Sequence, residues 1–190
     1  MSDDHELRLL SDKVLRYYQK AGSQELQYCM SDPDFFFVES SGGEKESQGI
    51  VNVLENRAKA DGSTLMTQVS DKKGYGVYGV RKNTYNTEKG LPADQKRANV
   101  HIAIAKALST GTDLTNGGFF WDGKDFNPRA NVNGGYKARY ARGYLFTNPS
   151  HDLYNLGSHQ VNGTYRYQST AAIGSTTFSR KYNQRGNNWR

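Results

Sequence analysis

The sequence predicts an α+β protein that is mainly helical and has a small β-hairpin or sheet portion in its C-terminal third. In the first two thirds, apolar residues recur at the 3.6-residue spacing of amphipathic helices. From residue 135 onward, tyrosines and small residues alternate with charged residues, a period typical of strands. A length of 190 residues without internal repeat or linker indicates one domain, 1–190. Within it we distinguish a helical N-terminal extension (1–31), helices with a groove (34–126) and a basic β-rich part (127–190).

The most clearly predicted helix runs from Glu44 to Lys59, because its apolar residues share one face: Ile50, Val51, Leu54 and Ala58. Asp61 to Ser63 should form a loop, and 64–69 is either one more helical turn or a short strand. Pro92 begins another helix, which Gly111 ends. Two further helices are predicted over 4–20 and 34–41.

The C-terminal third is expected to contain short strands at 136–140 and 165–167, with a hairpin turn at Asn162-Gly163. Upstream of it, Thr115 to Gly118 has the composition of a turn. That turn leads directly into Phe119-Phe120-Trp121, the densest aromatic cluster of the chain.

Charge is distributed unevenly along the chain. The net charge is +6, yet residues 1–125 carry 16 Lys and Arg against 18 Asp and Glu, whereas 126–190 carry nine Lys and Arg against one acid, Asp152. A basic region of this kind attracts a polyanion, such as nucleic acid or an anionic cell-wall polymer, or an acidic protein.

Several classes of protein are not expected. Cys29 is the single cysteine, so no disulfide forms within the chain, and no phosphate loop or metal-ligand spacing is present. We therefore expect no metal and no cofactor. No run of 18 apolar residues exists, so we expect no membrane insertion. The acidic start lacks the layout of a secretory signal, which predicts synthesis in the cytoplasm without a signal peptide.

Glu39 is the candidate general acid, because it directly follows the apolar residues 35–38. Apolar surroundings disfavour the charged form of a carboxyl group, which raises its pKa and lets it donate a proton near neutral pH. The alternative interpretation is an ordinary solvated glutamate next to core residues.

Three segments, in order, resemble the bacterial cell-wall hydrolase family that includes the spore-cortex-lytic enzymes. Val38 to Arg57 resembles the family's Glu-Ala-Arg-Gly-Glu motif and the helix that ends in Asn-Arg. Ala107 to Phe120 is similar to its Asp-Pro-Thr-Asn-Gly-Ala-aromatic segment, and Ile173 to Phe178 to its closing Ile-Gly-x-His-x-Phe. This chain departs from the family at Ser40-Ser41, at Thr176 in place of His, and by an insertion before Ile173.

The resemblance implies a lysozyme-like fold and cleavage of the β-1,4 bond between N-acetylmuramic acid and N-acetylglucosamine, with Glu39 as acid and then base. A lytic transglycosylase needs one carboxyl group, whereas a hydrolase needs a second to position water. The candidates for that second carboxylate are Glu44, Glu46 and Asp71. The candidates for substrate binding are Ser41, Tyr75, Tyr78, Gly118, Phe119, Phe120 and Trp121; the rings among them would stack on sugars or else pack in the core.

The expected partners are peptidoglycan glycan strands and a cognate immunity protein, with nucleic acid not favoured. An enzyme made without a signal peptide needs delivery to the periplasm or cell wall of a target cell, either as an antibacterial type VI secretion effector or by phage lysis. Two alternatives remain open: a basic, Tyr-rich module that binds nucleic acid or another polyanion, and a phage endolysin or structural protein.

Overall fold

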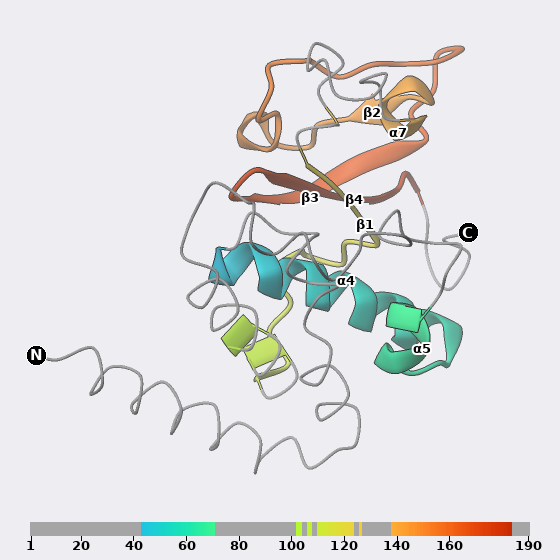
Figure 1. Ribbon diagram of the computed structural model, residues 1–190. Helices are drawn as coiled ribbons and strands as arrows, with labels where there is room; N and C mark the ends of the chain where they lie inside the picture. The colour runs from blue at the N-terminus through green and yellow to red at the C-terminus, as the bar shows by residue number, and fades with distance from the viewer. Residues whose placement is uncertain are drawn as a thin grey trace, which may run out of the picture.

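The computed structural model describes residues 43–70, 102–103, 106–107, 110–123, 126 and 138–183. Figure 1 shows helix α4 along one face of a sheet, with the segments around β2 and α7 on the opposite side. The elements are α4 (Glu44–Asp61), α5 (Leu65–Ser70), β1 (Phe120–Asp122), α7 (Ala138–Ala141), β2 (Tyr144–Leu145), the 3₁₀ turn η3 (Pro149–His151), β3 (Tyr167–Ile173) and β4 (Thr176–Lys181).

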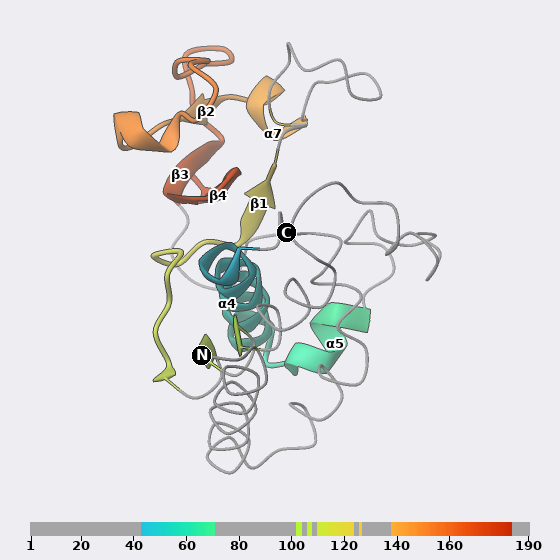
Figure 2. The ribbon, with the colours of Figure 1, turned by 60° about the vertical axis from the view of Figure 1, so that its left-hand side comes forward.

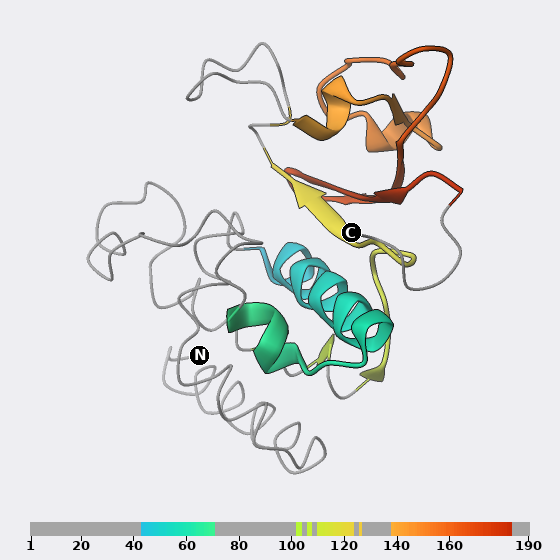
Figure 3. The same ribbon diagram turned by 90° about the vertical axis from the view of Figure 1, so that its right-hand side faces the viewer.

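The sheet has four strands in the order β1-β4-β3-β2. β3 and β4 form an antiparallel hairpin whose last pair is Ile173 and Thr176, and Gly174 takes a φ of 61° in the turn between them. β1 adds antiparallel to the outer side of β4, and β2 adds parallel to β3. The hairpin is therefore the centre of the sheet, and Figure 3 shows β1 beside it on the side of α4.

The predicted helix from Glu44 to Lys59 is confirmed as α4, which continues to Asp61. Gly62 ends it with a φ of 63°, a left-handed conformation that glycine adopts without strain. The loop between α4 and α5 accordingly runs from Gly62 to Thr64, one residue later than the predicted Asp61 to Ser63. Of the two interpretations of 64–69, the structure has the helical one, α5.

α4 packs closely against the sheet where Gly49 meets Phe178 of β4. A Cβ atom built on Gly49 would lie 2.6 Å from the Cζ atom of that ring, so only glycine leaves room for it. Ile50, Val51, Val53 and Leu54 are fully buried on the same helix. Figure 2 views α4 nearly end on, with the sheet on one side of it and α5 on another.

The opposite side of the sheet is covered by an aromatic cluster. Phe126, Tyr144 and Tyr167 are buried there, and Tyr140 and Phe146 pack against them. The ring centroids of Phe126 and Tyr144 are 4.9 Å apart. These rings connect the segment 138–160 to β3, so the sheet has a packed layer on each face.

The prediction of a strand over 136–140 is wrong for its described part, because Ala138 to Ala141 form the helical turn α7. Both Arg139 and Tyr140 have partners inside the molecule: Arg139 bonds Asp122, and Tyr140 contacts Phe126. Successive residues of a strand point to opposite faces. The helical turn instead directs Arg139 to β1 and Tyr140 to the aromatic layer. The alternating sequence pattern did not reveal these partners.

Two turn predictions are confirmed. Asn162 and Gly163 have φ values of 51° and 72°, and Val161 and Thr164 on either side pair with each other. Residues 115–118 form a turn in which Asn116 and Gly117 also have positive φ, 52° and 76°. The predicted helix end at Gly111 coincides with a φ of 64° there. The predicted helices over 4–20 and 34–41 lie outside the described residues.

The described part of the chain combines a mixed sheet with α4 on one face and the aromatic layer, to which α7 contributes, on the other. The expectation that helix dominates the whole chain rests also on segments beyond it and stays a prediction. Among the residues that the structure describes, no helix is long and apolar enough to cross a membrane.

Candidate functional site

The predicted site residues fall into two groups. Glu44, Glu46, Gly118, Phe119, Phe120 and Trp121 are described, and they lie on α4, on the loop before β1 or on β1 itself. The remaining candidates lie outside the described residues: Glu39, Ser41, Asp71, Tyr75 and Tyr78.

The loop before β1 is organised by Asp113. Its Oδ1 atom accepts hydrogen bonds from the amide of Thr115 at 2.8 Å and from the Thr115 hydroxyl at 2.6 Å. Its Oδ2 atom accepts from the amide of Gly117 at 2.7 Å. Burial opposes the charged form of this carboxyl, but the hydrogen bonds from Thr115, Asn56 and Gly117 together hold its pKa below the usual value. An ionised Asp113 therefore stabilises the loop conformation.

α4 holds the same loop from the other side through Asn52 and Asn56. The Asn56 amide nitrogen donates to Oδ2 of Asp113 and to the carbonyl of Gly118, both at 3.0 Å. The Asn52 side-chain oxygen accepts from the amide of Leu114 at 3.1 Å. Two amides one turn apart on α4 thus fix both ends of the turn at 115–118.

Arg57 continues this connection to the aromatic segment. Its Nε atom donates to the carbonyl of Phe119 at 2.6 Å. Its guanidinium carbon lies 5.2 Å from the ring centre of Phe120 and 5.3 Å from that of Trp121, within the range of cation–π attraction. The arginine is mostly buried, so it fixes the backbone and both rings together.

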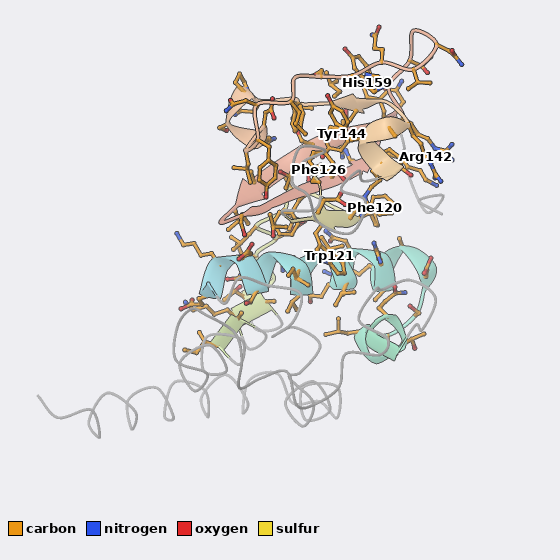
Figure 4. All side chains as sticks on the ribbon, turned by 45° about the horizontal axis from the view of Figure 1, so that its top comes forward. Phe120, Trp121, Phe126, Arg142, Tyr144 and His159 are labelled. Atoms are coloured by element: carbon orange, nitrogen blue, oxygen red, sulfur yellow. The ribbon has the colours of Figure 1, made fainter. Side chains whose placement is uncertain are left out.

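Phe120 and Trp121 lie on opposite faces of β1, because consecutive strand residues alternate. Phe120 meets Tyr167 edge to face at 5.5 Å, and the guanidinium carbon of Arg139 lies 4.9 Å from its ring centre. Phe120 therefore belongs to the aromatic layer. Trp121 pairs with Phe178 across the strands, and Figure 4 shows it between β1 and α4. Both rings are half-buried, but only Phe120 packs in the aromatic layer, so Trp121 is the better candidate to meet a sugar.

Glu46 is enclosed at the other end of α4. Its Oε1 atom accepts from the hydroxyl of Thr176 at 2.5 Å and from that of Ser175 at 3.2 Å, and only 2% of the residue is exposed. A Cβ atom on Gly174 would lie 3.1 Å from this carboxylate, so a glycine in the turn leaves space for it. These contacts suit a residue that fastens α4 to the β3–β4 hairpin rather than one that meets a substrate.

Glu44 is the more accessible of the two described carboxylates. It forms an ion pair with Lys106, and about a third of its side chain, 34%, is exposed. A partly exposed pair of this kind contributes little to stability, typically about 0–1 kcal/mol. Of the two candidates for a second carboxylate on α4, only Glu44 has a surface that a glycan can reach.

Asn56, Arg57 and Asp113 belong to the segments that carry the resemblance, but the sequence assigned them no role, and Asn52 was not predicted as a site residue at all. Asparagine is a poor helix former, so two asparagines one turn apart in a helix with a buried face are a signal for polar partners. Their partners lie 57 to 62 positions away, which no local pattern specifies.

A Ser–His pair occurs elsewhere, between Ser169 of β3 and His151 of η3. The His151 Nδ1 atom lies 2.9 Å from the Ser169 hydroxyl, and burial lowers the pKa of His151. The amide of Thr147 also donates to that hydroxyl, at 2.9 Å, and Ser169 is 1% exposed. A serine so enclosed is closed to a substrate, so this pair fastens the loop at 147–151 to the sheet.

Within the described ranges, no group of three or more His, Cys, Asp or Glu side chains is placed to hold a metal ion. Comparison with protein-family models, curated proteins and solved structures found no match to this chain.

Proposed function

We propose that this protein cleaves the β-1,4 bond between N-acetylmuramic acid and N-acetylglucosamine in peptidoglycan, with Glu39 as general acid and then base. We propose that the protein is an antibacterial effector. A type VI secretion system delivers it into the periplasm of a target cell, and an immunity protein counters it. The glycan strand is the substrate.

The observation that supports this proposal most is the contact of α4 with both other segments of the motif set. α4 directly follows the Glu39 segment in the sequence. Asn56 bonds Gly118 from 62 positions away, and Glu46 bonds Thr176 from 130 positions away. Three segments chosen from the sequence for their resemblance to one family therefore meet in space through polar side chains.

The chemistry requires a proton donor for the glycosidic oxygen, which is a poor leaving group. Glu39 follows four apolar residues, and burial against them would keep it protonated near neutral pH. Internal attack by the muramic 6-hydroxyl then gives a 1,6-anhydro product. This route needs only one catalytic carboxyl group, that of Glu39. Attack by water requires a second carboxylate, for which Glu44 and Asp71 are the remaining candidates, since Glu46 is enclosed.

The decisive experiment is Glu39→Gln in the full chain, with purified sacculi as substrate and released muropeptides as readout. The change keeps the shape of the side chain and removes the proton donor, so we expect release to fall by at least about a hundredfold. Glu55→Gln is the matched control, because it makes the same change on α4 and its amide oxygen can still accept the hydrogen bond that Glu55 receives from Asn52. Release by Glu39→Gln equal to that of the control would refute the assignment.

Mass analysis of the products separates the two reaction types. Reducing ends indicate hydrolysis, and 1,6-anhydro ends indicate transglycosylation. If reducing ends form, Glu44→Gln and Asp71→Asn should be compared, and the variant that loses activity identifies the second carboxylate.

A further inference from the structure

One end of the sheet gathers cations and tyrosines from three separate segments. The carbonyl of Gly143, the residue after Arg142, accepts hydrogen bonds from the amides of Arg166 and Tyr167, both at 3.0 Å. The carbonyl of Arg166 accepts from the amide of Tyr182 at 2.8 Å, and Tyr167 pairs with Lys181. Backbone bonds thus hold the ends of α7, β3 and β4 together. We call Arg142, Tyr165, Arg166, Lys181 and Tyr182 the basic end patch.

Gly143 makes this convergence possible. Its φ of 97° lies in the region that favours glycine, and a Cβ atom on it would lie 2.7 Å from the carbonyl oxygen of Thr164. The same atom would lie 3.4 Å from the Cα atom of Tyr165. The backbone next to Arg142 therefore lies directly against the backbone next to Arg166.

Two cations of the patch, Arg166 and Lys181, lie close enough for one to influence the other. Burial lowers the pKa of Lys181, and the charge of Arg166 lowers it further. Arg142 and Arg166 are exposed, and Figure 4 shows Arg142 at the outer edge of the molecule. Like charges held together cost free energy in the absence of an anion, and a bound anion removes that cost.

The segment from residue 126 to residue 190 itself contributes little negative charge. Asp152 is the single acid between residues 126 and 190. Its two carboxylate oxygens accept from the amides of Leu156 at 2.8 Å and Gly157 at 2.7 Å, so it serves a loop of its own. Asp122 of β1 is bonded by Arg139 through both of its oxygens, at 2.7 and 2.8 Å.

The patch also presents aromatic surface. The ring centroids of Tyr165 and Tyr182 are 5.9 Å apart with an angle of 55° between the rings, and 37% of Tyr182 is exposed. Arginine and lysine side chains bind phosphates, and exposed aromatic faces stack on nucleobases. Polyphosphate and poly(glycerol phosphate) offer the phosphates without a flat ring, so they would leave the tyrosines unused.

We propose that the basic end patch binds single-stranded nucleic acid, with Arg142, Arg166 and Lys181 on phosphates and Tyr182 stacked on a base. This activity goes beyond glycan cleavage and does not depend on it. It gives the polyanion-binding alternative considered from the sequence a defined location on the fold.

The test is fluorescence anisotropy of a short labelled oligothymidylate with the full chain over a series of salt concentrations. Three phosphate contacts to a single strand predict a slope of log affinity against log salt of about −2. Arg166→Ala combined with Lys181→Ala should reduce it to about −0.7. Tyr182→Leu should weaken binding about tenfold with the slope unchanged. Lys59 is an exposed lysine of α4, and Lys59→Ala is the control. It should leave both the affinity and the salt slope unchanged.

Competition with inorganic polyphosphate distinguishes the sources of phosphate. If Tyr182→Leu binds the oligonucleotide as the wild type does and polyphosphate competes equally well, the patch recognises charge alone and the nucleic-acid assignment is overturned. If the double variant Arg166→Ala with Lys181→Ala keeps the wild-type salt slope, the nucleic acid does not bind at the basic end patch. Thermal unfolding checks that the variants fold. If the double variant does not fold, Arg142→Ala at an exposed position replaces it. That single variant must reduce the magnitude of the salt slope by about 0.7, and an unchanged slope would overturn the proposal.

Discussion

Gly49 lies in the middle of α4 against the ring of Phe178, and replacing it with alanine tests how closely the helix must approach the sheet. A Cβ atom at this position would lie 2.6 Å from Cζ of the ring and 3.1 and 3.2 Å from its two Cε atoms. Phe178 is fully buried and sits on the central strand β4 between Trp121 of β1 and Ala171 of β3. The ring therefore has no free space to move into.

Two opposing contributions set the expected magnitude for Gly49→Ala. Alanine is better than glycine in a helix interior by about 0.8–1 kcal/mol. One extra carbon forced into a packed core costs about 1–3 kcal/mol. The overlap involves three ring atoms of an enclosed side chain, so we take the upper half of that range. We expect the free energy of unfolding to fall by about 1–2 kcal/mol.

Urea unfolding followed by circular dichroism measures this change, provided that the slope m is the same for both proteins. The same substitution in a Phe178→Leu background provides the internal control, because the overlapping ring atoms are gone. There Gly49→Ala should stabilise the protein by up to about 1 kcal/mol, which corresponds to a coupling energy of about 2–3 kcal/mol. Lys59→Gly, at an exposed position of the same helix, reports the cost of glycine without any packing change.

An increase in stability for Gly49→Ala in the otherwise unchanged protein would refute this reasoning. It would mean that α4 and β4 are farther apart than the contact of Gly49 with Phe178 implies. The same result would weaken the proposed function, because the bonds of Asn56 and Glu46 require α4 to lie against the sheet.

Two further predictions concern polar contacts of the sheet and its loops. The lowered pKa of Asp113 stabilises the fold above the unfolded pKa of about 3.8, and this contribution is lost as pH falls through the folded value. The difference in unfolding free energy between wild type and Asp113→Asn should therefore shrink from pH 5 toward pH 2; a constant difference would contradict it. Arg139→Met should destabilise by about 3–5 kcal/mol in urea unfolding, because it leaves Asp122 charged at 1% exposure. The double variant with Asp122→Leu should recover most of that loss, and no recovery would show that the pair is not the cause.

The sequence by itself determined the local features of the described fold. The apolar face of α4 and the turns at 115–118 and 162–163 were predicted from spacing and from the Asn-Gly signals, whereas the end of α4 was predicted two residues early, at Lys59. These features depend on neighbouring residues alone. A helix needs an apolar face every 3.6 residues, and a turn with positive φ needs asparagine or glycine.

The tertiary structure decided which of the predicted site residues face inward and which partners they have. Nothing in the sequence near Glu46 indicated that hydroxyls 129 and 130 positions away would enclose it while Glu44 stayed accessible. Phe120 and Trp121 are adjacent and similar in type, yet β1 directs the first into the aromatic layer and the second toward α4. Likewise, α7 replaces a predicted strand because Arg139 and Tyr140 both find partners inside the molecule. Burial and polar pairing depend on segments that are distant in sequence, and their free energies outweigh the small preferences that a local pattern expresses.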